Sequence, residues 1–318
     1  MYIGHTAFVP ATDRLSAKAL FAFSVGRIEV EIHSYCNRRC DYCPNAVGDR
    51  LGSNQRMPDD IWSMILADLH EIDYAEYFVF SNYNEPLADR TVLQRIRQAR
   101  QAIPRARIMV YSNGDYLNEA YLEELVAAGL DYLHISIHCK PGSSYREVDA
   151  LNHIAKLERR IRSPIHFQQL KPGEFIFARV PHPKMEIEVR AINYHHHGTN
   201  RGGLVRRTTP VPKRSLPCYF PFTHFQVGYR GDVVPCCHLR SDADVHRQYR
   251  YGNLRDYGSI YETYASRIAT EWRRHLISLE PKDPPCDYCI EAFLSNDQKM
   301  FDEVRRVWQR SVRDAPLP

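Results

Sequence analysis

Three closely spaced cysteines constrain this chain more than any other feature. Cys36, Cys40 and Cys43 follow a short β-branched run at residues 28–32. Cubane iron–sulfur clusters that only carry electrons are normally closed by four cysteine thiolates. A set of three therefore predicts a cluster with one iron left free to bind a small molecule. Zinc is the alternative, although zinc sites usually take a fourth Cys or His and often come as two separated pairs.

The triplet resembles the signature of the radical S-adenosylmethionine (SAM) superfamily. That signature is C-x3-C-x-aromatic-C, and this sequence reads C-NRR-C-DY-C from Cys36 to Cys43. The resemblance implies that the free iron of a [4Fe–4S] cluster holds the amino and carboxylate groups of SAM. It also implies that Tyr42 lies along the adenine. The expected chemistry is a 5′-deoxyadenosyl radical that takes a hydrogen atom from the substrate, with the protein supplying position and environment.

The bulk composition is that of an ordinary globular protein. The chain has 318 residues, of which 44% are hydrophobic and 25% are charged, and its net charge is +4. This charge gives no case for a dedicated nucleic-acid surface. The apolar run at residues 17–25 is too short to cross a bilayer and lacks the features of a secretory signal. We expect a cytoplasmic protein with no membrane or nucleic-acid partner, whose nine cysteines are metal ligands rather than disulfides.

A strand-then-helix rhythm runs from residue 27 to residue 193 and predicts an α/β fold with a parallel sheet. Six strand–helix units predict a partial (β/α)6 barrel, in which chemistry gathers at the carboxyl ends of the strands. The expected strands cover 27–33, 76–80, 107–111, 132–138, 165–170 and 185–193, and the expected helices cover 59–71, 91–102, 117–128 and 145–162.

The pattern changes after residue 193, which predicts a second, smaller region. A hairpin is expected at 225–227 and 233–234 around the turn at Gly231, followed by helices at 260–279 and 291–312. We therefore divide the chain into an N-terminal extension (1–26), the partial barrel (27–210) and a C-terminal auxiliary-cluster domain (211–318). The stretch 172–183 is the least clear, with Phe177 in a connecting loop as one interpretation.

Four further cysteines lie in the second region. They fit either structural zinc or a closed iron–sulfur cluster. The spacing C-x12-G-x4-C with Gly231 resembles the opening of the SPASM domain, the auxiliary-cluster extension of many radical SAM enzymes. Full SPASM domains have further cysteines where this chain has Ser295 and Lys299. The resemblance, over roughly residues 27–293, thus implies the truncated twitch form with one auxiliary [4Fe–4S] cluster, held by Cys218, Cys236, Cys286 and Cys289.

The same resemblance suggests which residues contact SAM. Asn84-Glu85-Pro86 follows the second strand, where the family usually has G-G-E-P, and Glu85 is expected to receive the SAM ammonium group. Ser112 and Asn113 are expected at the ribose hydroxyls. Ser136 and His138 end the fourth strand, where many relatives have an acidic residue. The SAM-contacting candidates are Tyr42, Asn84, Glu85, Ser112, Asn113, Ser136 and His138.

The substrate is expected to bind at the end of the last barrel strand, through Asn193, Asn200 and Arg201. The size and cluster spacing resemble those of the twitch-bearing dehydrogenase that oxidises an amino-cyclitol alcohol in butirosin biosynthesis. The resemblance implies oxidation of a hydroxyl-bearing carbon in a polar small molecule, such as an amino-cyclitol or amino sugar. It also implies a reducing partner such as flavodoxin or ferredoxin.

Three alternatives stay open. A radical epimerase would use Cys237 or Cys139 as a hydrogen-atom donor, although either cysteine could simply be packed. Cys237 adjoins Cys236 on an expected strand, so the two side chains should face opposite ways. A peptide maturase is less favoured, because the residues before the first strand are too few for a leader-binding domain. A zinc-binding module without enzymatic activity is the third alternative.

Overall fold

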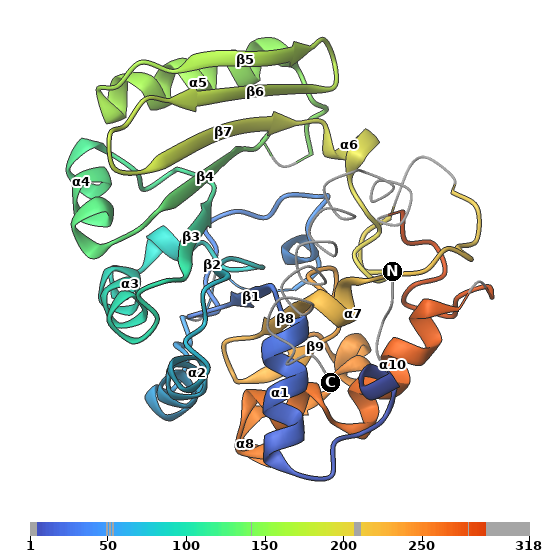
Figure 1. The fold of residues 1–318 in the computed structure, drawn as a ribbon. Coiled ribbons are helices and arrows are strands. Elements are labelled where there is room, and N and C mark those ends of the chain that lie inside the picture. Colours follow the sequence, from blue (N-terminus) through green and yellow to red (C-terminus); the bar gives the residue numbers. More distant parts are fainter. Residues whose placement is uncertain are drawn as a thin grey trace.

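The computed structural model describes residues 5–48, 50, 52, 54–140, 142–206, 211–278 and 280–290. Its centre is one curved sheet of ten strands in the order β10-β9-β8-β1-β2-β3-β4-β7-β6-β5 (Figure 1). The strands are β1 (Arg27–Val30), β2 (Tyr77–Phe80), β3 (Arg107–Ser112), β4 (Tyr132–Ile137), β5 (His166–Lys171), β6 (Phe175–Val180), β7 (Glu186–Ile192), β8 (His224–Val227), β9 (Asp232–Val234) and β10 (Gly252–Asn253).

Helices cover the outer side of the parallel strands, and a cluster of short helices forms the C-terminal module (Figure 1). The α-helices are α1 (Arg14–Ser24), α2 (Asp59–Glu71), α3 (Thr91–Ala102), α4 (Glu119–Ala128), α5 (Glu147–Ile161), α6 (Tyr194–His197), α7 (Phe220–Thr223), α8 (Leu254–Tyr257), α9 (Ile260–Tyr264) and α10 (Arg267–Ile277). Four short 3-10 helices are η1 (His5–Phe8), η2 (Pro44–Ala46), η3 (Pro86–Ala88) and η4 (Asp244–Tyr249).

The strands separate an apolar outer face from a polar inner face. In β1, Ile28 and Val30 belong to the main hydrophobic core that the helices cover. Glu29 points the other way and is only 7% exposed. This alternation follows from the two-residue period of a strand. The inner face has a small apolar cluster of Val79, Met109 and Tyr132. The fold therefore places charged groups inside the curve of the sheet.

The α/β fold class is confirmed, but two strands of the parallel set differ from the prediction. β4 pairs in parallel with β7, whereas β5 lies at the sheet edge and pairs only with β6. The unclear stretch 172–183 contains all of β6, so Phe177 lies on a strand rather than in a loop, and β6 is antiparallel to both neighbours. β8, expected only as part of a separate hairpin, pairs in parallel with β1. Strand pairing depends on contacts that are distant in the sequence, so periodicity alone did not reveal it.

Of the other predicted elements, two helices and the hairpin are confirmed and one helix differs. The expected helices at 59–71 and 91–102 match α2 and α3. The hairpin is confirmed, and Gly231 adopts a φ of +87° in its turn. The single helix expected at 260–279 is two helices, because Ser266 caps a new helix by accepting a hydrogen bond from the Ala269 amide. The helix expected at 291–312 lies outside the described residues.

The N-terminal segment packs against the C-terminal module. The Phe21 ring of α1 makes edge contacts with the rings of Phe225, Tyr261 and Tyr264. The buried Arg273 of α10 donates from Nε to the carbonyl of Ala7 at 2.6 Å. Residues 5–24 therefore complete the C-terminal module rather than extending from the fold. Within the described residues, no helix is long and apolar enough to cross a membrane.

Candidate active site

A cavity of about 400 Å³ opens at the carboxyl ends of β1–β4 and extends to β8 and the C-terminal module. All three cysteines of the triplet contribute to its wall. Most of the predicted SAM and substrate residues line it as well. The members of the predicted set that line the cavity are Cys36, Cys40, Tyr42, Cys43, Asn84, Glu85, Ser112, Asn113, Ser136, His138, Arg201 and Cys237.

The Glu85 carboxylate is bound by the protein's own donors. Oε1 accepts from Ser112 Oγ at 2.6 Å and from the Leu87 amide at 3.1 Å, and Oε2 accepts from the Asn113 amide at 2.6 Å. Burial raises the pKa of Glu85 to about 7 in spite of these bonds. Because its acceptor positions are largely used, Glu85 fixes the end of β3 against the turn after β2.

Asn84 presents the opposite situation. Its side chain is 7% exposed and lines the cavity, and neither Nδ2 nor Oδ1 has a hydrogen-bond partner in the protein. A buried amide normally finds partners, because leaving one unpaired costs free energy. The unpaired amide therefore indicates a polar ligand in this part of the cavity.

Tyr42 lies between two aromatic neighbours. Its ring stacks on Tyr194 with 4.7 Å between centroids, and its hydroxyl lies 2.9 Å from Nδ1 of His138. Burial lowers the pKa of His138 to about 4, so this imidazole is neutral at pH 7. The predicted pair Tyr42 and His138 thus meets across the carboxyl end of β4. With one ring face covered by Tyr194, Tyr42 offers its remaining surface to the cavity.

The cysteine-bearing loop is tied to the end of β3. Arg38, which lies between Cys36 and Cys40, binds Asp115 through both Nε (2.7 Å) and Nη2 (2.6 Å). Asn37 also donates to Asp115, at 2.7 Å. Two-point arginine–carboxylate pairs fix direction as well as distance. The loop therefore has a defined position although it contains little regular structure.

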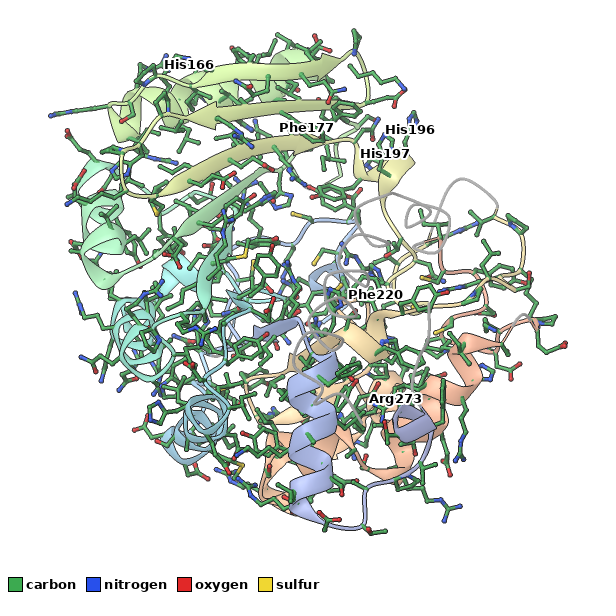
Figure 2. The ribbon with its side chains drawn as sticks, in the orientation of Figure 1. His166, Phe177, His196, His197, Phe220 and Arg273 are labelled. Carbon is green, nitrogen blue, oxygen red and sulfur yellow. The ribbon has the colours of Figure 1, made fainter. Side chains whose placement is uncertain are left out.

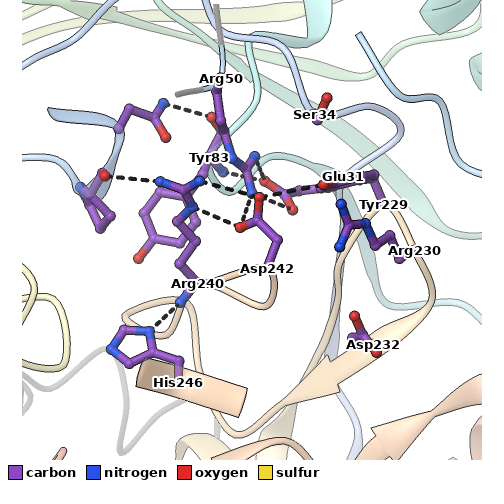
Figure 3. Close-up of polar contacts among 12 residues, drawn as sticks. Glu31, Ser34, Arg50, Tyr83, Tyr229, Arg230, Asp232, Arg240, Asp242 and His246 are labelled. Carbon is purple, nitrogen blue, oxygen red and sulfur yellow. Dashed lines mark hydrogen bonds and ion pairs between the residues drawn. The ribbon is translucent and has the colours of Figure 1, made fainter. Parts of the chain in front are cut away.

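A buried ion-pair network joins the same loop to the C-terminal module (Figure 3). Arg50 donates to Glu31, at the end of β1, at 2.5 Å and to Asp242 at 2.8 Å. Arg240 donates to Asp242 at 2.7 Å and, from Nη1, to the carbonyl of Pro44 at 3.0 Å. Burial alone would raise the pKa of Asp242, but its bonds to the two arginines hold the pKa well below its usual range.

The four remaining predicted ligands surround a second cavity. Cys218, Cys236, Cys286 and Cys289 line it, together with mostly apolar side chains such as Trp272. No carboxylate is among the described residues that line this space. Iron–sulfur clusters are held by cysteine thiolates in this way. The residues present therefore fit an auxiliary cluster.

Cys236 and Cys237 serve different cavities. Cys236 lines the cavity of the four cysteines, whereas Cys237 lines the larger cavity with the triplet. The expected opposite orientation is thus found, although β9 ends at Val234 and the two cysteines lie in a turn rather than on a strand. Tyr83 donates to the Cys237 carbonyl at 2.8 Å. The turn consequently separates the two cysteine-lined cavities.

The other predicted residues lie elsewhere. Cys139 lines a separate cavity of about 350 Å³ beside α5. Asn193 caps α6: its Oδ1 accepts from the His195 amide, and its Nδ2 donates to the Gly173 carbonyl at 2.9 Å. Neither Asn193 nor Asn200 is among the residues that line the large cavity. Arg201 does line it, has a φ of +49°, and its buried Nε has no partner in the protein.

Sequence reasoning missed the far wall of the large cavity. This wall includes charged groups that begin β1 and β8. Arg27 and Glu29 alternate with apolar residues along β1, and that alternation was the available signal. Phe220 of α7 lies near the middle of the molecule (Figure 2). The further lining residues are Arg27, Glu29, Arg38, Asn45, Ser81, Asn82, Tyr83, Tyr111, Tyr194, Phe220 and His224.

The donor sets also bear on the zinc alternative. Among the described residues, no group of three or more His, Cys, Asp or Glu converges closely enough to hold a single metal ion. A mononuclear zinc site needs such convergence, because its ligands lie about 2.0–2.3 Å from one ion. The triplet instead borders a cavity with an unpaired polar side chain, Asn84. This arrangement fits an open cluster with a bound polar molecule.

Comparison with known families agrees with this geometry. Residues 30–141 match the radical SAM superfamily, and residues 218–290 match the SPASM iron–sulfur cluster-binding domain. The chain is therefore a radical SAM enzyme with a SPASM-type C-terminal domain, and its cofactors are SAM and iron–sulfur clusters.

Among known proteins, the chain is similar to the S-adenosyl-L-methionine-dependent 2-deoxy-scyllo-inosamine dehydrogenase of Niallia circulans. The two are 26% identical over 209 residues, which are 66% of this chain and 72% of the relative. The fold resembles crystal structures of BtrN. The complex with AdoMet and 2-DOIA has a TM-score of 0.57 at 24% identity and covers 79% of this chain and 87% of BtrN. The open conformation has a TM-score of 0.54 at 21% identity and covers 85% and 97%.

Proposed function

We propose that this enzyme oxidises a hydroxyl-bearing carbon of an amino-cyclitol or amino sugar to a ketone. One observation supports this most: a single cavity has both the cysteine triplet and the charged side chains of Arg27, Glu29 and Arg201 in its wall. Such a wall suits a small ligand rich in hydroxyl and amine groups. The name of the 26% identical relative, a 2-deoxy-scyllo-inosamine dehydrogenase, supports the same substrate class.

At the cysteine end, the chain's own residues would bind and orient SAM. Cys36, Cys40 and Cys43 would hold three corners of a [4Fe–4S] cluster. When bound and reduced, this cluster and SAM supply the radical that removes hydrogen from the substrate carbon. The unpaired Asn84 amide would contact polar groups of SAM, and Glu85 would position Asn84 by fixing the turn after β2. Tyr42 would lie along the adenine, with Ser112, Asn113, Ser136 and His138 around the ribose end.

The charged side chains of the cavity wall would bind the substrate. Arg201 would bind substrate oxygens, since its buried Nε has no partner within the protein. Asn193 and Asn200 would act through the backbone around Arg201 rather than by contact. Cys218, Cys236, Cys286 and Cys289 would hold an auxiliary [4Fe–4S] cluster behind Cys237, where the second electron from the substrate can be accepted. The division at residues 27–210 and 211–318 matches these two roles.

The direct test uses anaerobically reconstituted protein, SAM, a reductant and a panel of amino-cyclitols and amino sugars. A ketone and 5′-deoxyadenosine formed in equal amounts would support the proposal. Solvent deuterium incorporated at the same carbon without net oxidation would refute it. The Cys40→Ala variant is the matched control, because it removes one cluster ligand and should abolish both products.

Epimerisation is the second candidate, and one observation favours it. Cys237 lines the large cavity beside Arg201, where a thiol could return a hydrogen atom to a substrate radical. Cys139, in its separate cavity, is less suitably placed. A Cys237→Ala variant that still converts substrate at the wild-type rate would remove Cys237 from this role. Loss of turnover, combined with an epimerised wild-type product, would establish it.

The reductant would be a small acidic electron carrier such as flavodoxin or ferredoxin, and the enzyme would act in the cytoplasm. Two basic residues support the first point. Lys140 and Lys156 line the cavity beside α5 and make no ion pair within the described part of the chain. The neighbouring cavity also contains Lys156 and includes Arg38 of the cluster-binding loop. Opposite charge steers association, so Lys140→Glu and Lys156→Glu should slow reduction by flavodoxin but not by dithionite.

A further inference from the structure

Arg214 is a buried cation in the cavity of the four C-terminal cysteines. The residue is only 1% exposed. Among the described residues that line this cavity, Arg214 is the one that carries a permanent charge. A charge taken out of water costs much free energy unless it is paired and hydrogen-bonded. The partners of this guanidinium therefore indicate what the cavity is built to hold.

The backbone gives Arg214 hydrogen bonds without an opposite charge. Its Nε donates to the Leu216 carbonyl at 2.9 Å, and its Nη2 donates to the Pro217 carbonyl at 2.6 Å. Within the described ranges, no ion pair between Arg214 and an Asp or Glu side chain is found, and no carboxylate lines the cavity. The two carbonyls therefore orient the guanidinium but do not neutralise it.

The cysteines supply the remaining partners of Arg214. The guanidinium hydrogen-bonds the Cys218 side chain and interacts electrostatically with Cys218, Cys286 and Cys289. Cys218 precedes α7, whereas Cys286 and Cys289 lie beyond α10. Cysteine binds metal as the thiolate, which is negatively charged. The cation thus lies against ligands from both parts of the predicted set.

Backbone hydrogen bonds fix Arg214 relative to the second pair of cysteines. The Arg214 amide donates to the carbonyl of Asp287, which lies between Cys286 and Cys289, at 2.6 Å. The Lys282 amide donates to the Arg214 carbonyl at 2.8 Å. Because the segment is held from both sides, the position of the guanidinium is set by the fold rather than by a flexible loop.

A second buried cation of this region is held differently. Lys282 is 0% exposed, and its Nζ donates to the Ser278 carbonyl at 2.6 Å, to Ser278 Oγ at 2.8 Å and to the Glu280 carbonyl at 2.9 Å. Lys282 is not among the residues that line the cavity. Arg214 is therefore the cation that faces the site of the auxiliary cluster.

We propose that Arg214 raises the reduction potential of the auxiliary cluster by holding a permanent positive charge against Cys218. This inference rests on the proposed function, in which the four cysteines hold a cluster that accepts the second electron. The substrate radical gives one electron to the cluster and its hydroxyl proton to water as the C=O bond forms. Reduction adds one negative charge to the cluster, and a fixed cation in an apolar cavity stabilises that charge. Arg214 acts through the ligands and is a positioning residue.

The test is a redox titration followed by electron paramagnetic resonance. The reconstituted full-length chain carries Cys36→Ala, Cys40→Ala and Cys43→Ala, so that only the auxiliary cluster is titrated. Adding Arg214→Gln should lower the ratio of reduced to oxidised cluster about tenfold at a fixed potential, which is about 59 mV for a one-electron couple. Arg214→Lys keeps the charge, and its ratio should stay within about threefold of the parent.

The matched control is Arg267→Gln, which removes the same charge from a side chain on α10 that is 83% exposed. Solvent screens an exposed charge, so this ratio should change less than about twofold. Urea unfolding reports the structural contribution of each arginine separately. Arg214→Gln with a lowered stability and an unchanged potential would overturn the proposal, because Arg214 would then only hold the backbone. An equal shift in Arg214→Lys and Arg214→Gln would also overturn it.

A second measurement keeps the proposal testable if Arg214→Gln does not retain the cluster. Pulsed electron paramagnetic resonance of the parent protein, labelled with nitrogen-15 arginine, should show a guanidinium nitrogen coupled to the reduced auxiliary cluster. This coupling should disappear in Arg214→Lys. Absence of the coupling in the parent, or its persistence in Arg214→Lys, would contradict the proposal.

Failure of the proposed function would look different. The titration contains no substrate, so its outcome does not depend on which molecule the enzyme oxidises. A wild type that makes no ketone from any amino-cyclitol or amino sugar would refute the proposed function and leave the measured potentials unchanged.

Discussion

The Glu85 carboxylate accepts a hydrogen bond from the Asn113 backbone amide at 2.6 Å, so the turn after β2 is fastened to the end of β3. This bond lies beside the unpaired amide of Asn84. The two adjacent residues therefore have different roles. Glu85 accepts hydrogen bonds from backbone amides, and Asn84 lines the cavity. The sequence alone suggested a ligand contact for both.

Replacing Asn84 should weaken SAM binding without lowering stability. The Asn84→Ala change removes a buried amide that has no partner in the protein, so the free energy of unfolding should not decrease. SAM affinity should fall about tenfold, the equivalent of one lost hydrogen bond. Equilibrium dialysis of the reconstituted protein measures this. The exposed Asn152 supplies the control, and equal SAM affinity in Asn84→Ala and Asn152→Ala would contradict the assignment.

Glu85 should give stability a distinct pH dependence. Its pKa rises from about 4.5 to about 7 on folding, so the folded protein binds this proton more tightly than the unfolded chain. The free energy of unfolding should therefore decrease as pH rises from about 4.5 to about 7, by up to about 3 kcal/mol. In Glu85→Gln this contribution is absent. Thermal unfolding at about pH 5 and pH 7.5 should show a smaller difference in the variant, and parallel behaviour would argue against the shift.

The ion-pair network between the cluster-binding loop and the C-terminal module should be sensitive to single changes. Asp242→Asn leaves the buried Arg50 and Arg240 with one carboxylate fewer, which should cost about 3–5 kcal/mol of stability. Urea unfolding measures this cost. Asp244→Asn is the matched control, because the Asp244 side chain is 90% exposed and its loss should cost less than about 0.5 kcal/mol. Similar losses in both variants would mean that the network does not contribute as described.

Removing a ligand from one set of cysteines should leave the cluster of the other set intact. Cys289→Ser removes a ligand of the auxiliary set only, so iron content should fall by roughly half while SAM cleavage by dithionite-reduced protein persists. Ketone formation should be lost, because the second electron has no acceptor. Iron and sulfide analysis, together with product chromatography, checks both points. Loss of SAM cleavage with full retention of the other cluster would show that the two sites are not independent.

Local sequence patterns predicted the parts of the site that depend on adjacent residues. The cysteine triplet, the hairpin around Gly231 and the polar residues after β2, β3 and β4 are all local features, and the structure brings most of them to one cavity. The polar residues of β1 and β8 that line the cavity were missed because their placement depends on strand pairing. Glu29 and His224 are neighbours only because β8 pairs in parallel with β1, although nearly two hundred residues separate them in the chain.

The edge of the sheet illustrates the same limit. β6 follows Pro172 and Gly173, which indicated a loop, yet Phe175–Val180 pairs with β7 along its whole length. Turn-forming residues mark where a chain reverses and do not show whether the returning segment joins a sheet. β5 was recognised as a strand from its composition, but nothing in its sequence indicated that β7 would take its expected place beside β4.

The most direct measurement follows one hydrogen atom. Reconstituted enzyme is incubated with SAM, a reductant and an amino-cyclitol that carries deuterium at its hydroxyl-bearing carbon. The account predicts one deuterium in 5′-deoxyadenosine for each ketone formed, because the cavity brings both molecules together. SAM cleavage without deuterium transfer from any tested amino-cyclitol or amino sugar, or no SAM cleavage at all, would contradict it.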